Sequence, residues 1–126
     1  MALRTPLANA RGLGSAKKGV DHWWKQRLTS IALVPLGLWF AFSVALLGTA
    51  DYYTAVSWLR YPVNAVLMLL VLAVGFWHGA LGLKVVIEDY IDTEWQKITL
   101  ILLVHFAAVI LALAGIFAVL TIALGA

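Results

Sequence analysis

The sequence contains no cysteine, and only 12% of its 126 residues are charged. Without cysteine the chain cannot form disulfides, zinc–thiolate centres or cysteine-ligated iron–sulfur clusters. It also has no internal repeat and no low-complexity segment. Any metal bound by this chain would therefore need histidine or oxygen ligands.

What the sequence has in excess is apolar surface. Hydrophobic residues make up 63% of the chain, and its mean hydropathy is +0.96. No soluble globular domain of this size has such a composition. Because so short a chain cannot bury this much apolar surface by itself, lipid or other membrane subunits must cover it. The composition predicts one small integral membrane protein.

Three apolar runs are each long enough to cross a bilayer. They cover approximately residues 28–48, 62–87 and 98–124. Only helices satisfy the backbone of such single segments in lipid, so the pattern predicts an all-α integral membrane fold with three transmembrane helices. We divide the chain into a basic amino-terminal segment, 1–26, and a three-helix transmembrane anchor, 27–126.

Basic residues predict the orientation of these spans. Six of them precede the first run: Arg4, Arg11, Lys17, Lys18, Lys25 and Arg27. Arg60 is alone in the first connection, whereas Lys84 and Lys97 flank the second. By the positive-inside rule we expect a multi-pass protein of the inner (cytoplasmic) membrane with a cytoplasmic amino terminus and a periplasmic carboxyl terminus. The second connection then faces the cytoplasm.

The basic amino-terminal stretch has other interpretations. It resembles a targeting peptide in having almost no acid before Asp21. However, the apolar core of a signal peptide runs roughly 7–15 residues, and the first run here is longer, which favours a retained cytoplasmic tail. The net charge of +3 could also indicate nucleic-acid binding. Topology and anionic lipid headgroups explain the same charges, so we expect phospholipid and no nucleic acid as a partner.

His78 and Asp89 are polar residues in and just after the second apolar run. Their eleven helical steps come to about 20° past three full turns, so both lie on one helix face, roughly 16 Å apart along the axis. Tyr90 follows next, near the water interface. Ionisable groups are costly in hydrocarbon, and in such spans they usually mark ion, proton or cofactor sites.

The imidazole of His78 is suited to one such site. A neutral imidazole can ligate haem iron while its second ring nitrogen makes a hydrogen bond. Gly75, Gly79 and Gly82 cluster on the same part of the helix and would let a flat macrocycle or another helix come close. The alternative is that His78 bonds a neighbouring helix and the glycines serve packing alone.

His105, on the third run, is a competing ligand. Counted from the cytoplasmic ends of antiparallel helices, His105 and His78 lie at similar depths, so one chain could supply both axial ligands of a haem. Whether their faces converge does not follow from the sequence. The alternative for His105 is a hydrogen bond that serves helix packing, and Lys84 is close enough to a span end to reach the headgroups.

Asp89 and Tyr90 suggest a different chemistry at the membrane surface. A carboxylate can relay protons and a phenol can donate to a carbonyl oxygen, and the reduction of a quinone needs both. The alternative is an acidic, solvated helix end. Arg27, where the first span meets water, could pair with haem propionates or with phospholipid phosphate.

In this order, these residues resemble the smaller hydrophobic membrane anchor of bacterial succinate dehydrogenase, respiratory complex II. The resemblance covers essentially the whole chain. It begins with His22 and Arg27, before and at the start of a first span that opens RLTSIAL. It continues with His78 and Gly79 and with the segment GLKVVIEDYI. The ten residues between His78 and the Asp89–Tyr90 pair are the most specific part of the resemblance.

The resemblance implies that the three helices form half of a heterodimeric, haem-binding helical bundle. His78 would be an axial ligand of the haem b iron, and the second histidine would come from the partner anchor subunit, a cytochrome b. Arg27 would lie near the haem propionates, and His22 could join that polar cluster. Tyr90 would hydrogen-bond a ubiquinone carbonyl, with Asp89 beside it in the quinone pocket and proton path.

The function implied by the resemblance is that of an anchor in succinate:ubiquinone oxidoreductase. A flavoprotein subunit containing FAD oxidises succinate, and an iron–sulfur subunit conducts the electrons to the membrane. The present chain would help to hold ubiquinone at the receiving end and would catalyse nothing alone. The resemblance gives no role to His105 or Lys84.

Two other classes of function stay open. The first is the anchor of another b-type cytochrome or quinol oxidoreductase, such as fumarate reductase, in which His78 and His105 share a haem within one chain. The second is a non-redox membrane protein, such as a small transporter or an assembly factor, in which the histidines only pack. Binding of haem by the chain without a partner would favour the first, and purification without haem or redox subunits would favour the second.

Overall fold

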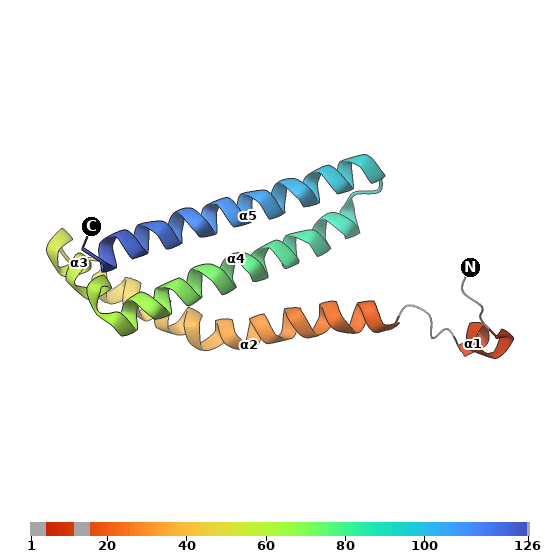
Figure 1. Cartoon of the computed structure of the whole chain (residues 1–126), viewed down its shortest axis with the longest axis horizontal. Helices are drawn as coiled ribbons and strands as arrows, with labels where there is room; N and C mark the ends of the chain where they lie inside the picture. The colour runs from red at the N-terminus through yellow and green to blue at the C-terminus, as the bar shows by residue number, and fades with distance from the viewer. Residues whose placement is uncertain (1–4, 12–15, 126) are drawn as a thin grey trace.

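Five helices make up the part of the chain that the structure, a computed structural model, describes, namely residues 5–11 and 16–125. In chain order the helices are α1 (Pro6–Arg11), α2 (Ala16–Leu47), α3 (Tyr52–Arg60), α4 (Pro62–Tyr90) and α5 (Glu94–Ala123). The three long helices lie side by side, and the two short ones lie near opposite ends of the molecule (Figure 1). No strand occurs in these residues, so the predicted all-α fold is confirmed.

Three helices are long and apolar enough to cross a membrane, as the sequence predicts. Their apolar stretches are Trp23–Leu47, Pro62–Tyr90 and Glu94–Ala123. In the most apolar part of each, no more than 11% of the residues are buried within the chain. Apolar side chains that this chain does not bury must contact lipid or another subunit.

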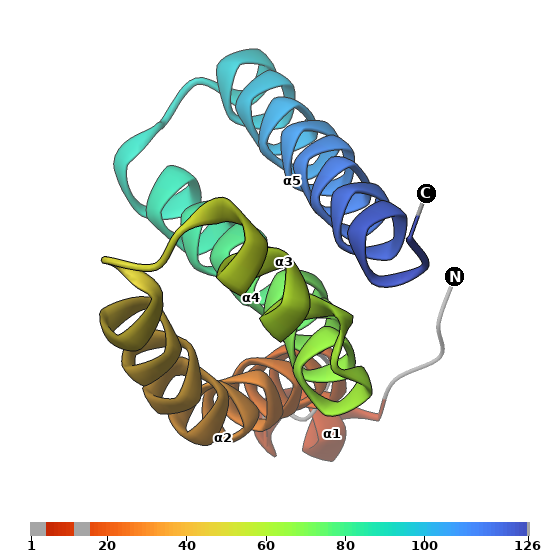
Figure 2. The same ribbon diagram turned by 90° about the vertical axis from the view of Figure 1, so that its left-hand side faces the viewer.

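Helix α4 lies between the other two long helices. Both α2 and α5 pack against it and run antiparallel to it (Figures 1 and 2). At the contact with α5, a Cβ atom added at Gly115 would lie 3.0 Å from Cδ2 of Leu72, which is closer than side chains normally pack. The absence of a side chain at Gly115 therefore allows these two helices to approach.

The first connection contains a helix that the hydrophobic pattern did not predict. Helix α3 begins after Asp51, whose side chain accepts a hydrogen bond of 3.0 Å from the backbone N–H of Thr54. Hydrogen bonds from the Thr54 side chain and then from its backbone hold the pKa of Asp51 below its ordinary value of 3.8. Trp58 of α3 stacks on Trp39 of α2 with ring centroids 5.6 Å apart. Pro62 then starts α4, where its missing N–H has no helical partner to lose.

The basic segment 1–26 is helical wherever the structure describes it, except at Thr5. Residues 1–4 and 12–15 lie outside the described residues. Helix α2 begins at Ala16, well before the apolar run starts at Leu28. Charged residues such as Lys and Arg are good helix formers, so the helix continues beyond the segment that hydropathy alone identifies.

Candidate functional site

His78 is half-buried on α4 and bonded to the neighbouring helix α2. Its Nδ1 atom lies 3.0 Å from the hydroxyl oxygen of Thr29. The same hydroxyl lies 2.9 Å from the carbonyl oxygen of Lys25 and 3.0 Å from that of Gln26, both one turn earlier on α2. One of the two imidazole nitrogens is therefore engaged within the chain, and Nε2 is the nitrogen left to bind a ligand.

The glycines near His78 leave the adjoining face of α4 open. Gly75, Gly79 and Gly82 lie within about 100° of His78 around the helix. A Cβ atom added at any of these three glycines would meet no atom within 4 Å. The α4 backbone is therefore accessible beside the imidazole to a flat group or to another helix.

An apolar groove adjoins this glycine face between α4 and α5. It has a volume of about 400 Å³. Its walls are Gly75, Phe76, Gly79, Ala80 and Leu83 of α4 and Val104, Ala107, Ala108 and Leu111 of α5. None of these side chains is polar, so the groove itself offers only van der Waals contacts to hydrocarbon.

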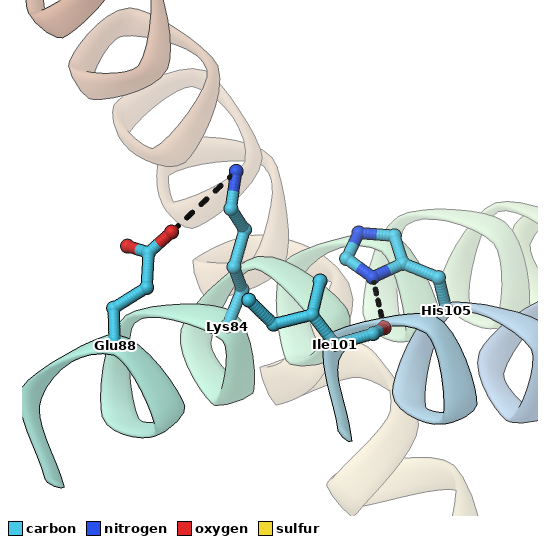
Figure 3. Close-up of polar contacts among 4 residues, drawn as sticks. All are labelled: Lys84, Glu88, Ile101 and His105. Carbon is cyan, nitrogen blue, oxygen red and sulfur yellow. Dashed lines mark hydrogen bonds and ion pairs between the residues drawn. The ribbon is translucent and has the colours of Figure 1, made fainter. Parts of the chain in front are cut away.

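His105, on α5, packs against a different face of α4 from the face that carries His78. It borders a second groove, of about 110 Å³, together with Trp77 and Ala80. These two residues lie about 100° and 200° around α4 from His78, whose ring contacts α2 instead. The imidazole of His105 donates from Nδ1 to the carbonyl oxygen of Ile101, 2.8 Å away (Figure 3). The structure therefore does not bring the two histidines together.

Lys84 forms an ion pair along its own helix. Its Nζ lies 3.9 Å from Oε1 of Glu88, one turn closer to the end of α4 (Figure 3). The ammonium group thus points toward the end of α4, which is the direction in which a lysine near a span end would reach the headgroups. Among the described residues, no group of three or more metal-ligating side chains is placed to hold an ion.

The hydrogen bond between Thr29 and His78 also fixes the depth of Arg27. Arg27 precedes Thr29 by two residues, so it lies about 3 Å along α2 from the level of the imidazole. Its guanidinium carbon lies 5.1 Å from the ring centroid of Trp23, a cation–π contact. Tyr90 is twelve residues beyond His78, about 18 Å away along α4. Arg27 is therefore closer in depth to the imidazole than to the end of α4.

Asp89 and Tyr90 occupy the last turn of α4 and are exposed. Tyr90 is 81% exposed, and no hydrogen bond or ion pair to either side chain occurs within the described residues. The phenol and the carboxylate are therefore available to a ligand or to another subunit at the end of the bundle where α4 meets α5 (Figure 1). His22 belongs to α2, but its side chain lies outside what the structure describes.

Sequence reasoning missed two polar residues near the imidazole. Thr29 is one of them, and the other is Gln26, whose Oε1 atom is buried without a hydrogen-bond partner in the described structure. Both lie within one helical turn of Arg27, where polar residues interrupt the start of an apolar span. That interruption was the only available signal, and it gives no indication that Thr29 contacts His78.

Comparisons with known proteins agree with the resemblance predicted from the sequence. A family model for the succinate dehydrogenase/fumarate reductase transmembrane subunit matches residues 1–112. The succinate dehydrogenase hydrophobic membrane anchor subunit of Rickettsia bellii (strain RML369-C) is 34% identical over 116 residues, which cover 92% of this chain and 93% of the relative. The subunit of the same name from Paracoccus denitrificans is 30% identical over 122 residues, 97% of this chain and 94% of the relative.

A third relative, the succinate dehydrogenase membrane anchor subunit of Reclinomonas americana, is 32% identical over 96 residues, 74% of this chain and 80% of the relative. No solved structure matches the chain significantly. The match of the family model and the identities over nearly full length confirm the predicted resemblance. The chain belongs to the succinate dehydrogenase/fumarate reductase transmembrane subunit family.

Proposed function

We propose that this chain is the smaller membrane anchor of a succinate:ubiquinone oxidoreductase, and that it contributes an axial ligand of haem b and part of the ubiquinone-reduction site. The observation that carries the proposal is the imidazole of His78. Its Nδ1 is held by Thr29, Nε2 has no partner within the described residues, and the adjoining glycines of α4 leave open space. This is the arrangement expected of a metal-ligating histidine, whose second nitrogen is normally hydrogen-bonded.

The residues around His78 fit a haem that is shared with another chain. Bound there, haem b would supply a one-electron redox centre inside the membrane. Nε2 of His78 would provide one axial ligand, and the open backbone at Gly75 and Gly79 would leave room for the macrocycle. Because His105 lies at another face of α4, the second axial ligand is expected from the partner anchor subunit.

Arg27 is suited to the haem propionates because of its depth. The register of α2 on α4 brings the backbone of Arg27 near the level of the imidazole, and its guanidinium lies over Trp23, one turn toward the amino terminus. Its positive charge there needs an anionic partner. Propionate carboxylates would satisfy it by charge-assisted hydrogen bonds, and the resemblance assigns Arg27 this role. His22 is included in the same proposed cluster on the resemblance alone.

Asp89 and Tyr90 are the proposed quinone contacts. Oxidation of succinate to fumarate in the flavoprotein subunit, which contains FAD, releases two electrons and two protons. The iron–sulfur subunit conducts the electrons, and reduction of ubiquinone to ubiquinol takes up two electrons and two protons at the membrane. The exposed Tyr90 hydroxyl would donate to a quinone carbonyl, and Asp89 would relay protons from the water interface.

The haem assignment is tested by replacing the ligand in the assembled complex. His78→Ala should lower the haem b content per complex and alter the low-spin spectrum, whereas the control His105→Ala should leave both unchanged. Unchanged haem in His78→Ala would reject the assignment. Loss of haem in both variants would favour a haem that His78 and His105 ligate together within one chain. A complex that purifies without haem or redox subunits would favour a non-redox membrane protein.

The quinone assignment is tested by Tyr90→Phe, which removes only the phenolic hydroxyl. We expect normal assembly and ubiquinone reduction slowed by about fivefold, because one neutral hydrogen bond contributes about 1 kcal/mol. Tyr61→Phe, at the opposite end of α4, is the matched control and should behave as the parent complex. Steady-state rates with a soluble quinone measure the effect. Normal kinetics in Tyr90→Phe would reject the hydrogen bond.

A further inference from the structure

Three possible hydrogen-bond partners surround the hydroxyl of Thr29, which has only one proton to donate. Nδ1 of His78 and the carbonyl oxygens of Lys25 and Gln26 all lie within 3.0 Å of it. A hydroxyl donates one hydrogen bond and accepts up to two, and a carbonyl oxygen only accepts. The position of the single hydroxyl proton therefore decides which nitrogen of the imidazole carries its proton.

Two arrangements of protons are possible for a neutral imidazole. If Thr29 donates to Nδ1, then Nε2 of His78 carries the ring proton, and this N–H group has no partner in the described structure. If Nδ1–H donates to Thr29 instead, the hydroxyl can donate in turn to a carbonyl of α2, which makes two hydrogen bonds and leaves no donor unpaired. In hydrocarbon no water is present to bond such a donor, so leaving it unpaired is costly. The second arrangement is therefore favoured.

We propose that Thr29 is a positioning residue that holds His78 with its proton on Nδ1 and the lone pair of Nε2 directed out of the chain for a metal ligand. This inference rests on the proposed function, because it assigns a purpose to the free Nε2. The hydroxyl fixes the tautomer and the orientation of the ring, and it increases the basicity of the ligating nitrogen. Since Thr29 and His78 are on different helices, the packing of α2 on α4 prepares the ligand before any metal binds.

His105 provides an internal comparison. Its Nδ1 donates to the backbone carbonyl of Ile101 on its own helix, so it has the same tautomer without help from another side chain. No substitution at Thr29 removes that acceptor. The two histidines should therefore give the same tautomer in the wild-type chain and should differ only when Thr29 is changed.

The first test measures haem affinity in the assembled complex. Thr29→Val keeps the branched shape and removes the hydroxyl, Thr29→Ser restores the hydroxyl, and Thr99→Val removes a hydroxyl that bonds only the carbonyl of Trp95 on its own helix. We expect Thr29→Val to lower the haem affinity by about 10- to 100-fold, the range typical of such supporting groups. Transfer of haem to a scavenging apoprotein and the electron paramagnetic resonance spectrum of the ferric haem are the readouts.

The expected series is a loss in Thr29→Val with near wild-type behaviour in Thr29→Ser and Thr99→Val. Equal haem affinity and spectra in Thr29→Val and wild type would overturn the inference, as would an equal loss in Thr29→Ser. The result for His78→Ala separates the two proposals. If His78→Ala loses haem and Thr29→Val does not, the ligand assignment stands and the role of Thr29 fails. If His78→Ala retains haem, the proposed function itself fails.

A second measurement needs no haem and remains decisive if Thr29→Val does not assemble. Nitrogen-15 chemical shifts of histidine in the full chain, reconstituted in lipid nanodiscs, distinguish a protonated ring nitrogen from an unprotonated one. The signals of His78 are assigned by their absence in His78→Ala. We expect Nδ1 to be protonated and Nε2 unprotonated in both His78 and His105. A protonated Nε2 in His78 would overturn the inference whatever the haem data show.

Discussion

The guanidinium of Arg60, at the end of α3, donates from Nε to the carbonyl oxygen of Ile122 in the last turn of α5, 3.2 Å away. The last carbonyls of a helix lack helical partners and carry partial negative charge. Gly125 completes this end with a positive φ of 76° and donates its N–H to the same carbonyl. The one basic residue of the first connection, Arg60, is thus bonded to the carboxyl-terminal end of α5.

Replacement of Arg60 should destabilise the end of α5. Arg60→Ala removes the hydrogen bond and the favourable charge at the helix terminus, and we expect it to lower the free energy of unfolding by about 1 kcal/mol. Arg60→Lys keeps the charge without the Nε donor and should lie between the two. Denaturation of the purified chain in bicelles measures the difference. Equal stability of Arg60→Ala and wild type would show that the contact contributes nothing.

Asp51 should make the start of α3 sensitive to acid. Because hydrogen bonds from Thr54 lower the pKa of Asp51 in the folded chain, the ionised cap stabilises α3 above the unfolded-state pKa. That stabilisation is lost as the pH falls below 3.8 and through the lowered pKa. Hydrogen-exchange protection of the Thr54 amide, corrected for intrinsic rates, should therefore fall at low pH. Asp51→Asn keeps a capping oxygen that does not titrate and should show no such fall.

The sequence was sufficient to predict the three spans because each is a continuous apolar run. It did not predict α3, since a nine-residue helix is shorter than any span and hydropathy treats it as a connection. Its signals were local, namely the cap at Asp51 and the break at Pro62. The beginning of α2 at Ala16 was missed for a related reason. The apolar run stops where charged residues begin, although the helix extends through them.

The candidate site could be predicted only as single residues. His78, Asp89 and Tyr90 stand out because polar groups are rare in apolar runs, and the structure places all three on α4. The contact of Thr29 with His78 could not be predicted in the same way. In a membrane helix apolar residues occur on every face, so periodicity does not show which face meets a neighbour or in which register.

The orientation predicted from the basic residues can be measured directly because the chain has no cysteine. Single cysteines at two exposed positions, Asp92→Cys between α4 and α5 and Tyr53→Cys on α3, report on opposite ends of the bundle (Figure 1). We expect a membrane-impermeant maleimide to label only Tyr53→Cys in spheroplasts and only Asp92→Cys in inside-out vesicles. The opposite pattern would place Tyr90 in the periplasm and would exclude electron delivery from a cytoplasmic iron–sulfur subunit.

The glycines distinguish packing within the chain from packing between chains. A Cβ atom added at Gly79 or at Gly37 on α2 would meet no atom within 4 Å, so we expect the isolated chain to tolerate Gly79→Leu and Gly37→Leu equally. Gly115→Leu should instead destabilise it by about 1–3 kcal/mol, because its Cβ would press on Leu72. Denaturation of the purified chain in bicelles tests this first comparison.

In the assembled complex the two tolerated variants should separate. If haem or the partner anchor occupies the glycine face of α4, overpacking at Gly79 should weaken haem binding or assembly by about 5- to 150-fold, the equivalent of about 1–3 kcal/mol. Gly37→Leu lies on another helix and should assemble normally with full haem. Haem content and subunit stoichiometry after purification are the readouts. Normal assembly and haem content in Gly79→Leu would mean that this face contacts only lipid, and a haem would then have to approach Nε2 of His78 from another direction.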